Sequence, residues 1–183
     1  MRSFYFLRHA LTDANAQKLL CGGAWDIPLN AEGQRQVVQA SRDYARALAE
    51  VRTICCSPLL RARQTADAFA KELKIPIIIT DDLKEQLLGA WEQKPWQDVP
   101  EFFSGEKDPP NGESRLQLDE RLQRALQEVS THEGPVLIVS HGSIWFALHR
   151  LLGLEPDTPG SCVPFHFQTL ESKAGKAWTR SRI

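Results

Sequence analysis

Short apolar runs alternate with longer segments of helical periodicity along most of the chain. Four runs have the length and the residue types of buried strands, and they cover residues 4–7, 53–56, 75–80 and 136–139. Between them, apolar positions recur at helical spacing over about 32–51, from 57 onward, from 114 onward and over about 143–152. Such alternation is typical of a mostly parallel sheet with helices on both faces, so we predict a three-layer αβα sandwich.

Capping residues indicate where three of these helices begin. Asn30 and Ser114 each stand just before a helical run, and both residue types accept a hydrogen bond from a backbone N–H of the first turn. Ser57 followed by Pro58 predicts a third start, with the serine as the cap and the proline at the first helical position. A later strand is expected over about 162–170, at an edge of the sheet.

The region from about residue 87 to residue 113 interrupts the alternation. It is rich in aromatic residues and proline and has no sustained period, so we expect an irregular excursion over the surface. The whole chain, residues 1–183, is therefore predicted to fold as a single domain. The aromatic residues from Trp91 to Phe103 are expected either to stack on a flat substrate or to form a small satellite core.

Composition and charge narrow the possible functions. The 22 lysines and arginines are balanced by 23 aspartates and glutamates, so neither nucleic acid nor an anionic membrane is expected as a partner. No apolar run approaches the roughly 20 residues that cross a bilayer, and the first run is too short for a signal peptide. The four cysteines lack C-x-x-C spacing, which favours a reduced, cytoplasmic protein without a disulfide framework or a zinc site.

Polar and charged residues stand at the carboxyl end of each predicted strand, where ligands bind in open parallel sheets. In chain order they are Arg8 and His9, Arg61, Glu85, and His141 with Gly142. Each alone has an ordinary explanation, since a histidine after a strand is usually structural. Arg61, however, lies in the first turn of a helix and opposes its dipole, which a bound anion would compensate. Together the residues predict an anion site that suits phosphate.

Five ordered elements of the sequence resemble the histidine phosphatase superfamily, also called the phosphoglycerate mutase-like superfamily. The elements cover residues 8–15, 23–33, 57–66, 83–92 and 139–142. The resemblance implies a phosphoglycerate mutase-like fold, with His9 as the nucleophile and Glu85 as the proton donor. It also implies the groups that hold the phosphate and the substrate: Arg8, Asn15, Gly23, Arg61, His141 and Gly142.

The implied chemistry is consistent with these residue types. Arginine can donate two parallel hydrogen bonds to phosphate, and phosphoryl transfer depends mainly on positioning and charge neutralisation. A neutral imidazole is a competent nucleophile near pH 7, because its unperturbed pKa is about 6.5. We therefore expect a phosphatase that uses no metal and no cofactor.

Two residues depart from the family pattern beside the nucleophile. Ala10 replaces a glycine and Leu11 replaces an acidic residue. If position 10 required a positive φ, alanine would be strained there by roughly 1 kcal/mol. If the family's glycine at this position lets the ligand come close to the backbone, the methyl group of Ala10 would narrow the pocket. In the next element, Gly22 stands where many relatives carry a polar residue.

Hydrolysis is favoured over mutase activity, because mutases of this superfamily carry a longer insertion, for which this chain is too short. Residues 110–114 and the Trp91-Glu92 pair resemble the α-ribazole-phosphate phosphatase branch, so the expected partner is a small-molecule phosphate ester. Two alternatives stay open: a mutase-type phosphotransferase or protein phosphohistidine phosphatase, and a regulatory module that binds phosphate with little catalysis. The sequence leaves the oligomeric state undetermined.

Overall fold

The computed structural model describes residues 3–172 and 175–183, and within them one six-stranded sheet forms the centre of the molecule. The strands are β1 (Ser3–Arg8), β2 (Thr53–Cys56), β3 (Ile77–Ile79), β4 (Val136–Ser140), β5 (Pro164–Ser172) and β6 (Gly175–Arg182). Their order in the sheet is β3-β2-β4-β1-β5-β6. Strands β1 to β4 run parallel to one another, β5 pairs antiparallel with β1, and β6 pairs antiparallel with β5. The predicted mostly parallel sheet is confirmed.

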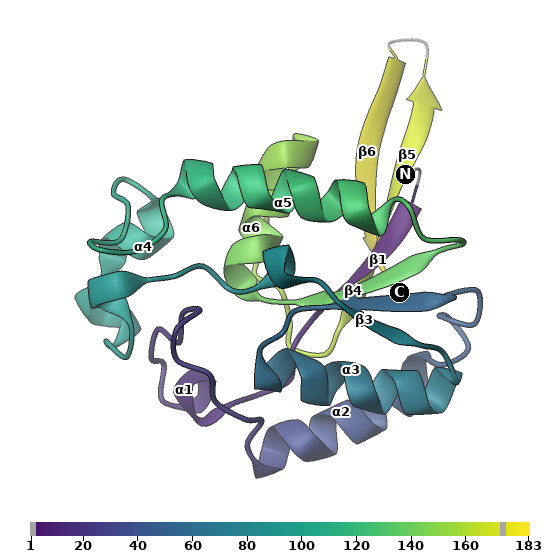
Figure 1. The fold of residues 1–183 in the computed structure, drawn as a ribbon, viewed down its shortest axis with the longest axis horizontal. Helices are drawn as coiled ribbons and strands as arrows, with labels where there is room; N and C mark the ends of the chain where they lie inside the picture. Colours follow the sequence, from purple (N-terminus) through teal and green to yellow (C-terminus); the bar gives the residue numbers. More distant parts are fainter. Residues whose placement is uncertain (1–2, 173–174) are drawn as a thin grey trace.

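Helices cover both faces of this sheet, as Figure 1 shows: α2 and α3 lie on one side, α5 and α6 on the other. Their bounds are α2 (Ala31–Tyr44), α3 (Leu60–Leu73), α5 (Arg115–Val129) and α6 (Gly142–Leu152). Five shorter helices also occur: α1 (Asp13–Ala16), η1 (Asp81–Leu83), η2 (Gly89–Trp91), η3 (Trp96–Asp98) and α4 (Pro100–Ser104). The predicted three-layer fold is therefore confirmed.

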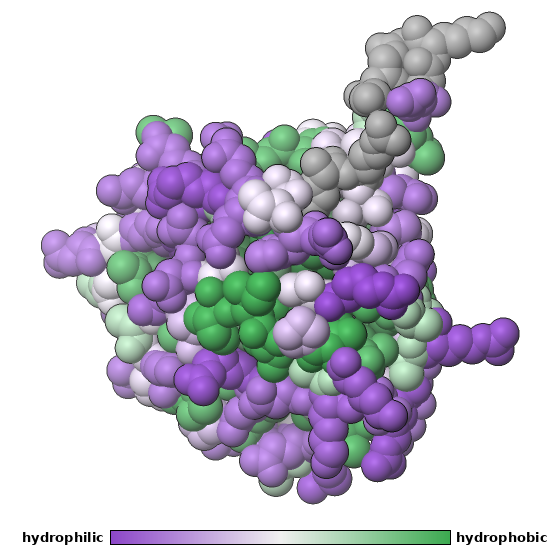
Figure 2. Space-filling view, turned by 45° about the vertical axis from the view of Figure 1, so that its right-hand side comes forward, coloured by the Kyte–Doolittle hydropathy of each residue, from purple (hydrophilic) through white to green (hydrophobic). Residues whose placement is uncertain are grey.

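Each face of the sheet buries its own apolar cluster. Phe4, Phe6 and Trp145 belong to the cluster under α5 and α6, whereas Leu7 and Phe69 belong to the one under α2 and α3. Alternate residues of a strand point to opposite faces, which is why Phe6 and Leu7 enter different clusters. In the view of Figure 2 the outer surface is mainly hydrophilic, with an apolar area near the middle. Within the described residues, no helix is both long and apolar enough to cross a membrane.

Two of the three predicted helix starts are confirmed. The side chain of Asn30 accepts a hydrogen bond from the Gly33 N–H, and Ser114 accepts one from Gln117. At its other end, α2 stops at Tyr44 instead of continuing to residue 51. The chain goes on in turns, because backbone hydrogen bonds such as Ala45 N–H to Arg42 O span three residues instead of four.

The predicted start at Ser57 and Pro58 is wrong. Helix α3 begins at Leu60, and its cap comes from elsewhere in the sequence: the Leu60 N–H donates to Oδ1 of Asp26 at 2.7 Å. The Ser57 hydroxyl lies instead 2.7 Å from Nε2 of His141. Sequence patterns detect local caps, and here the cap is not local.

The predicted later strand exists as β5, but it lies inside the sheet. Strand β6, which the sequence did not predict, forms the edge beside it. The excursion at 87–113 contains three short helices, so it is less irregular than expected. Its aromatic residues form a satellite cluster around Trp91, with Trp96 and Phe102 packed against it.

Candidate active site

The register of two neighbouring strands brings His9 and His141 side by side. Arg8 of β1 pairs with Ser140 of β4, so the next residue of each strand reaches the same sheet edge. The His9 N–H donates to the Ser140 carbonyl at 3.0 Å, and the two imidazole centroids are 5.2 Å apart. Two histidines that are distant in sequence therefore meet at the carboxyl ends of the parallel strands.

The His9 imidazole is buried, with 3% of its surface exposed, and one ring nitrogen is committed. Nδ1 lies 2.7 Å from the Ala10 carbonyl oxygen, which can only accept a hydrogen bond, so Nδ1 carries the proton. Burial lowers the pKa of His9 well below 6.5, and the charges of Arg61 and Arg8 lower it further. At neutral pH, Nε2 is therefore an unprotonated nitrogen with a free lone pair.

The second imidazole, that of His141, is fully buried next to the first. Its Nε2 lies 2.7 Å from the Ser57 hydroxyl, while its Nδ1 has no hydrogen-bond partner among the described residues. Burial lowers the pKa of His141 well below 6.5 as well, followed by the effect of Arg61. His141 is neutral at pH 7 and leaves one buried polar atom unsatisfied.

Two arginines add further unsatisfied polar atoms to the same place. Arg61, fully buried in the first turn of α3, donates from Nη2 to the Gly22 carbonyl at 2.8 Å. Arg8 donates from Nη1 to the Pro159 carbonyl at 3.2 Å. In both side chains Nε is buried without a partner among the described residues. Buried N–H groups of cations are costly to leave unpaired, so a bound acceptor, above all an anion, would stabilise this arrangement.

The Glu85 carboxylate lies across the same space from Arg8. It accepts hydrogen bonds from the backbone N–H of Ser143, at 3.1 Å, and of Gln86, at 2.9 Å. A Cβ atom built on Gly142 would lie 3.9 Å from both Arg8 Nε and Glu85 Oε2. The carboxylate, the guanidinium and the start of α6 therefore face one another.

A cavity of about 220 Å³ joins these groups, and six of the eight residues singled out from the sequence line it: Arg8, His9, Asn15, Arg61, Glu85 and Gly142. His141 is not among the lining residues, although its ring centroid lies 5.2 Å from that of His9. Gly23 also stays outside it: its N–H donates to the Gln86 carbonyl, and a Cβ there would overlap the Glu85 carbonyl oxygen. Gly22, its neighbour, lines the cavity instead.

The two residues that depart from the family pattern, Ala10 and Leu11, lie outside the cavity. Ala10 does not have a positive φ, so alanine is not strained there. Its methyl group lies in the apolar cluster under α2 and α3, and neither Ala10 nor Leu11 lines the cavity. The Leu11 N–H donates to the side chain of Gln36.

Sequence patterns missed three residues that complete the site. Ser57 was interpreted as a helix cap but contacts His141. Ser143 donates its N–H to Glu85, and Pro159 accepts from Arg8. Ser57 stands inside one of the family elements, which is a usable signal. Pro159 lies in a loop without any recognisable pattern.

Comparisons with known proteins identify the family. The model of the histidine phosphatase superfamily (branch 1) matches residues 4–170, so the chain belongs to this superfamily. A protein of Bacillus subtilis (strain 168) named uncharacterized phosphatase PhoE is 36% identical over 157 residues, covering 83% of this chain and 76% of the relative. A probable phosphoglycerate mutase, GpmB, from Escherichia fergusonii is 32% identical over 168 residues, covering 84% and 76%.

Solved structures confirm the same fold. The mycobacterial glucosyl-3-phosphoglycerate phosphatase Rv2419c, in complex with VO3, superposes with a TM-score of 0.84 at 23% identity, covering 99% of this chain and 98% of that one. A candidate alpha-ribazole-5'-P phosphatase of Escherichia coli str. K-12 substr. MG1655 gives a TM-score of 0.77 at 23% identity, covering 100% and 98%. At these identities the likeness concerns the fold. The fold is therefore phosphoglycerate mutase-like, as predicted.

Proposed function

We propose that this protein is a phosphomonoesterase that hydrolyses a small phosphate ester through a phosphohistidine on His9. The observation that carries the proposal is the state of His9, a neutral imidazole whose Nδ1–H is held by the Ala10 carbonyl. Its free Nε2 stands in a cavity where the Nε–H groups of Arg8 and Arg61 lack acceptors. Phosphate oxygens would satisfy these donors and place phosphorus before the nucleophile.

In the first step, Nε2 of His9 attacks phosphorus and the bond to the leaving oxygen breaks. Glu85, acting as the general acid, gives that oxygen its proton. Arg8 and Arg61 neutralise the charge on the equatorial oxygens. Water then attacks the phosphohistidine, Glu85 takes up the proton, and inorganic phosphate leaves. None of these steps calls on a metal or a cofactor.

His141 contributes a further donor in this proposal. The Ser57 hydroxyl accepts a hydrogen bond from the Leu59 N–H, and we propose that it donates a hydrogen bond to Nε2 of His141, which lies 2.7 Å away. Nδ1 of His141 then carries a proton, and it is the buried atom without a partner. A phosphate oxygen would accept from it.

The partner we propose is a small-molecule phosphate ester, because the balanced charge gives no overall basic field for nucleic acid or membrane. The cytoplasmic location is proposed from the cysteines, whose spacing favours a reduced protein. α-Ribazole 5'-phosphate is the first substrate to test, on the basis of residues 110–114 and the Trp91-Glu92 pair. The mutase alternative rests on the relative named as a probable mutase. Transfer of phosphate to a second hydroxyl, without release of inorganic phosphate, would favour it.

The experiment that tests the proposal is turnover of an aryl phosphate by the wild type and by His9→Ala. We expect the variant to lose at least about 10³-fold in kcat, because the covalent path is removed. Equal rates would contradict the assignment of the nucleophile. Phosphate binding without turnover in the wild type would favour the regulatory module.

A further inference from the structure

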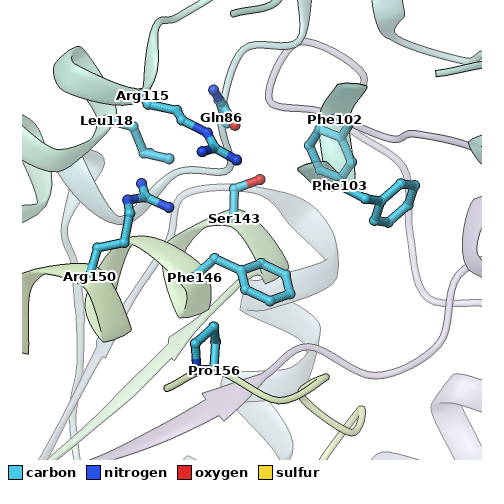
Figure 3. A pocket seen from close by; sticks show the side chains of 9 residues that line it. All are labelled: Gln86, Phe102, Phe103, Arg115, Leu118, Ser143, Phe146, Arg150 and Pro156. Atoms are coloured by element: carbon cyan, nitrogen blue, oxygen red, sulfur yellow. The ribbon is translucent and has the colours of Figure 1, made fainter. Parts of the chain in front are cut away.

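A second cavity, of about 270 Å³, adjoins the catalytic one. Phe102, Phe103, Ser143 and Phe146 line both cavities, whereas Arg115 and Arg150 line only the second. In Figure 3 the two guanidinium groups point toward the space over Ser143, and Phe102 and Phe103 lie on the opposite side. The catalytic site therefore continues into a space that is apolar on one side and cationic on the other.

This second cavity lies on the leaving-group side of the site. Ser143 donates its backbone N–H to the Glu85 carboxylate, and Gln86 is the next residue in the chain. Both Ser143 and Gln86 line the second cavity. An alcohol that takes its proton from Glu85 consequently leaves at the mouth of this cavity, where the rest of its skeleton is accommodated.

The two arginines differ in whether an acidic side chain neutralises their charge. Arg150 is paired with Asp119 through two hydrogen bonds, of 2.6 and 3.2 Å. The Arg115 guanidinium forms no ion pair among the described residues, because the nearby Asp108 carboxylate accepts from the Arg115 backbone N–H instead, at 2.9 Å. The lining of the cavity therefore includes one guanidinium without an ion-pair partner. Its position is set by Gly105, where a Cβ atom would overlap the guanidinium group. The glycine after α4 thus leaves room for the Arg115 guanidinium.

A buried hydroxyl in the same cavity also lacks a partner. Ser143 is 5% exposed, and its Oγ has no hydrogen-bond partner among the described residues. Gln86 is 6% exposed and anchored by a 2.8 Å hydrogen bond from Nε2 to the Glu113 carbonyl. A buried hydroxyl beside an uncompensated guanidinium is a matched pair of donors for an oxyanion.

We infer that the second cavity binds a singly charged anionic group, a carboxylate, carried by the leaving alcohol of the substrate. Arg115 and Ser143 donate to it, while Phe146 and Phe102 pack against the apolar part of the same alcohol. The inference rests on the proposed function for the orientation of the substrate. It favours an acidic phosphate ester over α-ribazole 5'-phosphate, whose leaving alcohol carries no charge.

Binding of two matched, non-hydrolysable phosphonates tests the inference without relying on turnover. The pair is 4-(carboxymethyl)benzylphosphonate and its carboxamide, titrated calorimetrically into the full chain. We expect the wild type to bind the carboxylate compound about tenfold more tightly than the amide compound, because only the carboxylate accepts a charge-assisted hydrogen bond from Arg115. In Arg115→Gln the preference should fall to about twofold or less, with the affinity for the amide unchanged.

Two further variants isolate the cause. Arg115→Lys keeps the charge and should retain part of the preference. Arg124→Gln removes an arginine of the same helix that pairs with Asp82 outside this cavity, and it should keep the whole preference. A circular dichroism spectrum unchanged from that of the wild type shows that each variant is folded.

The outcomes separate this inference from the proposed function. Equal affinities of the two phosphonates in the wild type, or an unchanged preference in Arg115→Gln, would overturn the inference. Failure of both compounds to bind would overturn it together with the phosphate site. An intact preference in a protein that hydrolyses no aryl phosphate would support the second anion site and contradict the proposed phosphatase.

Discussion

Two parts of the candidate site are built in different ways. The proposed phosphate-binding part, here called the phosphate floor, consists of four residues that end or follow a parallel strand or lie in the first turn of a helix: Arg8, His9, Arg61 and His141. Arg61 and His141 are fully buried and His9 is 3% exposed. The aromatic wall consists of Trp96, Phe102 and Phe103, on short helices of the excursion, and Phe103 is 56% exposed.

This contrast suggests that the phosphate floor determines the rate of the reaction and the aromatic wall determines which substrate binds. Pairing of β1 with β4 fixes the backbone positions from which Arg8, His9 and His141 project, and a change of register would displace them together. The aromatic wall packs against a small cluster around Trp91, and Phe103 joins it through ring contacts with Trp96 and Phe102. Segments of this kind tolerate substitution and insertion better than central strands do. We therefore expect floor substitutions to lower kcat and wall substitutions to change KM.

The largest effect is expected for Arg61→Gln in the phosphate floor. The change removes a buried cation aimed at the phosphate, so kcat/KM for an aryl phosphate should fall about 10³-fold. Arg63→Gln, which alters an exposed arginine two residues further along α3, is the matched control and should leave kcat/KM within twofold of the wild type. A loss below about tenfold in Arg61→Gln would contradict the role of the floor.

A smaller loss is expected for Glu85→Gln, and it should depend on the leaving group. An alkyl phosphate needs a proton on its leaving oxygen, so its kcat should drop about 10²-fold. A 4-nitrophenyl phosphate has a good leaving group and should lose about fivefold or less. Glutamine still offers an oxygen to the Ser143 N–H, which preserves the start of α6. Glu120→Gln, at an exposed position, is the control. Equal losses of kcat for both substrates in Glu85→Gln would argue against proton donation by Glu85.

The phosphate floor should also make stability depend on pH. Burial lowers the pKa of His9 and of His141 below 6.5, so below pH 6.5 the unfolded chain binds protons that the native state does not. The free energy of unfolding therefore falls as pH decreases, by roughly 1.4 kcal/mol per pH unit for each such histidine. Between pH 7.5 and 5.5, His9→Asn should lose about 1.4 kcal/mol less than the wild type. Urea titrations in phosphate-free buffer measure this, and identical pH dependences would show that His9 is not buried in its neutral form.

The smallest effect is expected in the aromatic wall. Phe103→Ala removes a half-exposed ring at the mouth of both cavities, so KM for an aryl phosphate should rise about threefold, with kcat within twofold. Leu116→Ala changes an apolar side chain that is 68% exposed outside these cavities and serves as the control. A fall in kcat without a change in KM would contradict the separation of floor and wall.

The sequence predicted the phosphate floor better than its surroundings, for physical reasons. His9 and His141 follow strands with strong apolar patterns, and parallel strands bring their carboxyl ends to one edge. The predicted start of α3 was wrong because the side chain that caps this helix, Asp26, comes from a loop distant in the sequence. Strand β6 was missed, and its residues lack the period-two apolar pattern of a half-buried strand. The uncompensated Arg115 depends on tertiary packing against Gly105, which no local pattern encodes.

The central claim, covalent catalysis by His9, is tested most directly by trapping the intermediate. The wild type is mixed with an aryl phosphate, quenched within milliseconds under alkaline denaturing conditions and digested, and the peptides are analysed by mass spectrometry. We predict a phosphate adduct on the imidazole of His9, stable in alkali, labile in acid and absent from His9→Ala. Turnover of the same substrate without any adduct on His9, or with an adduct on another residue, would contradict the account.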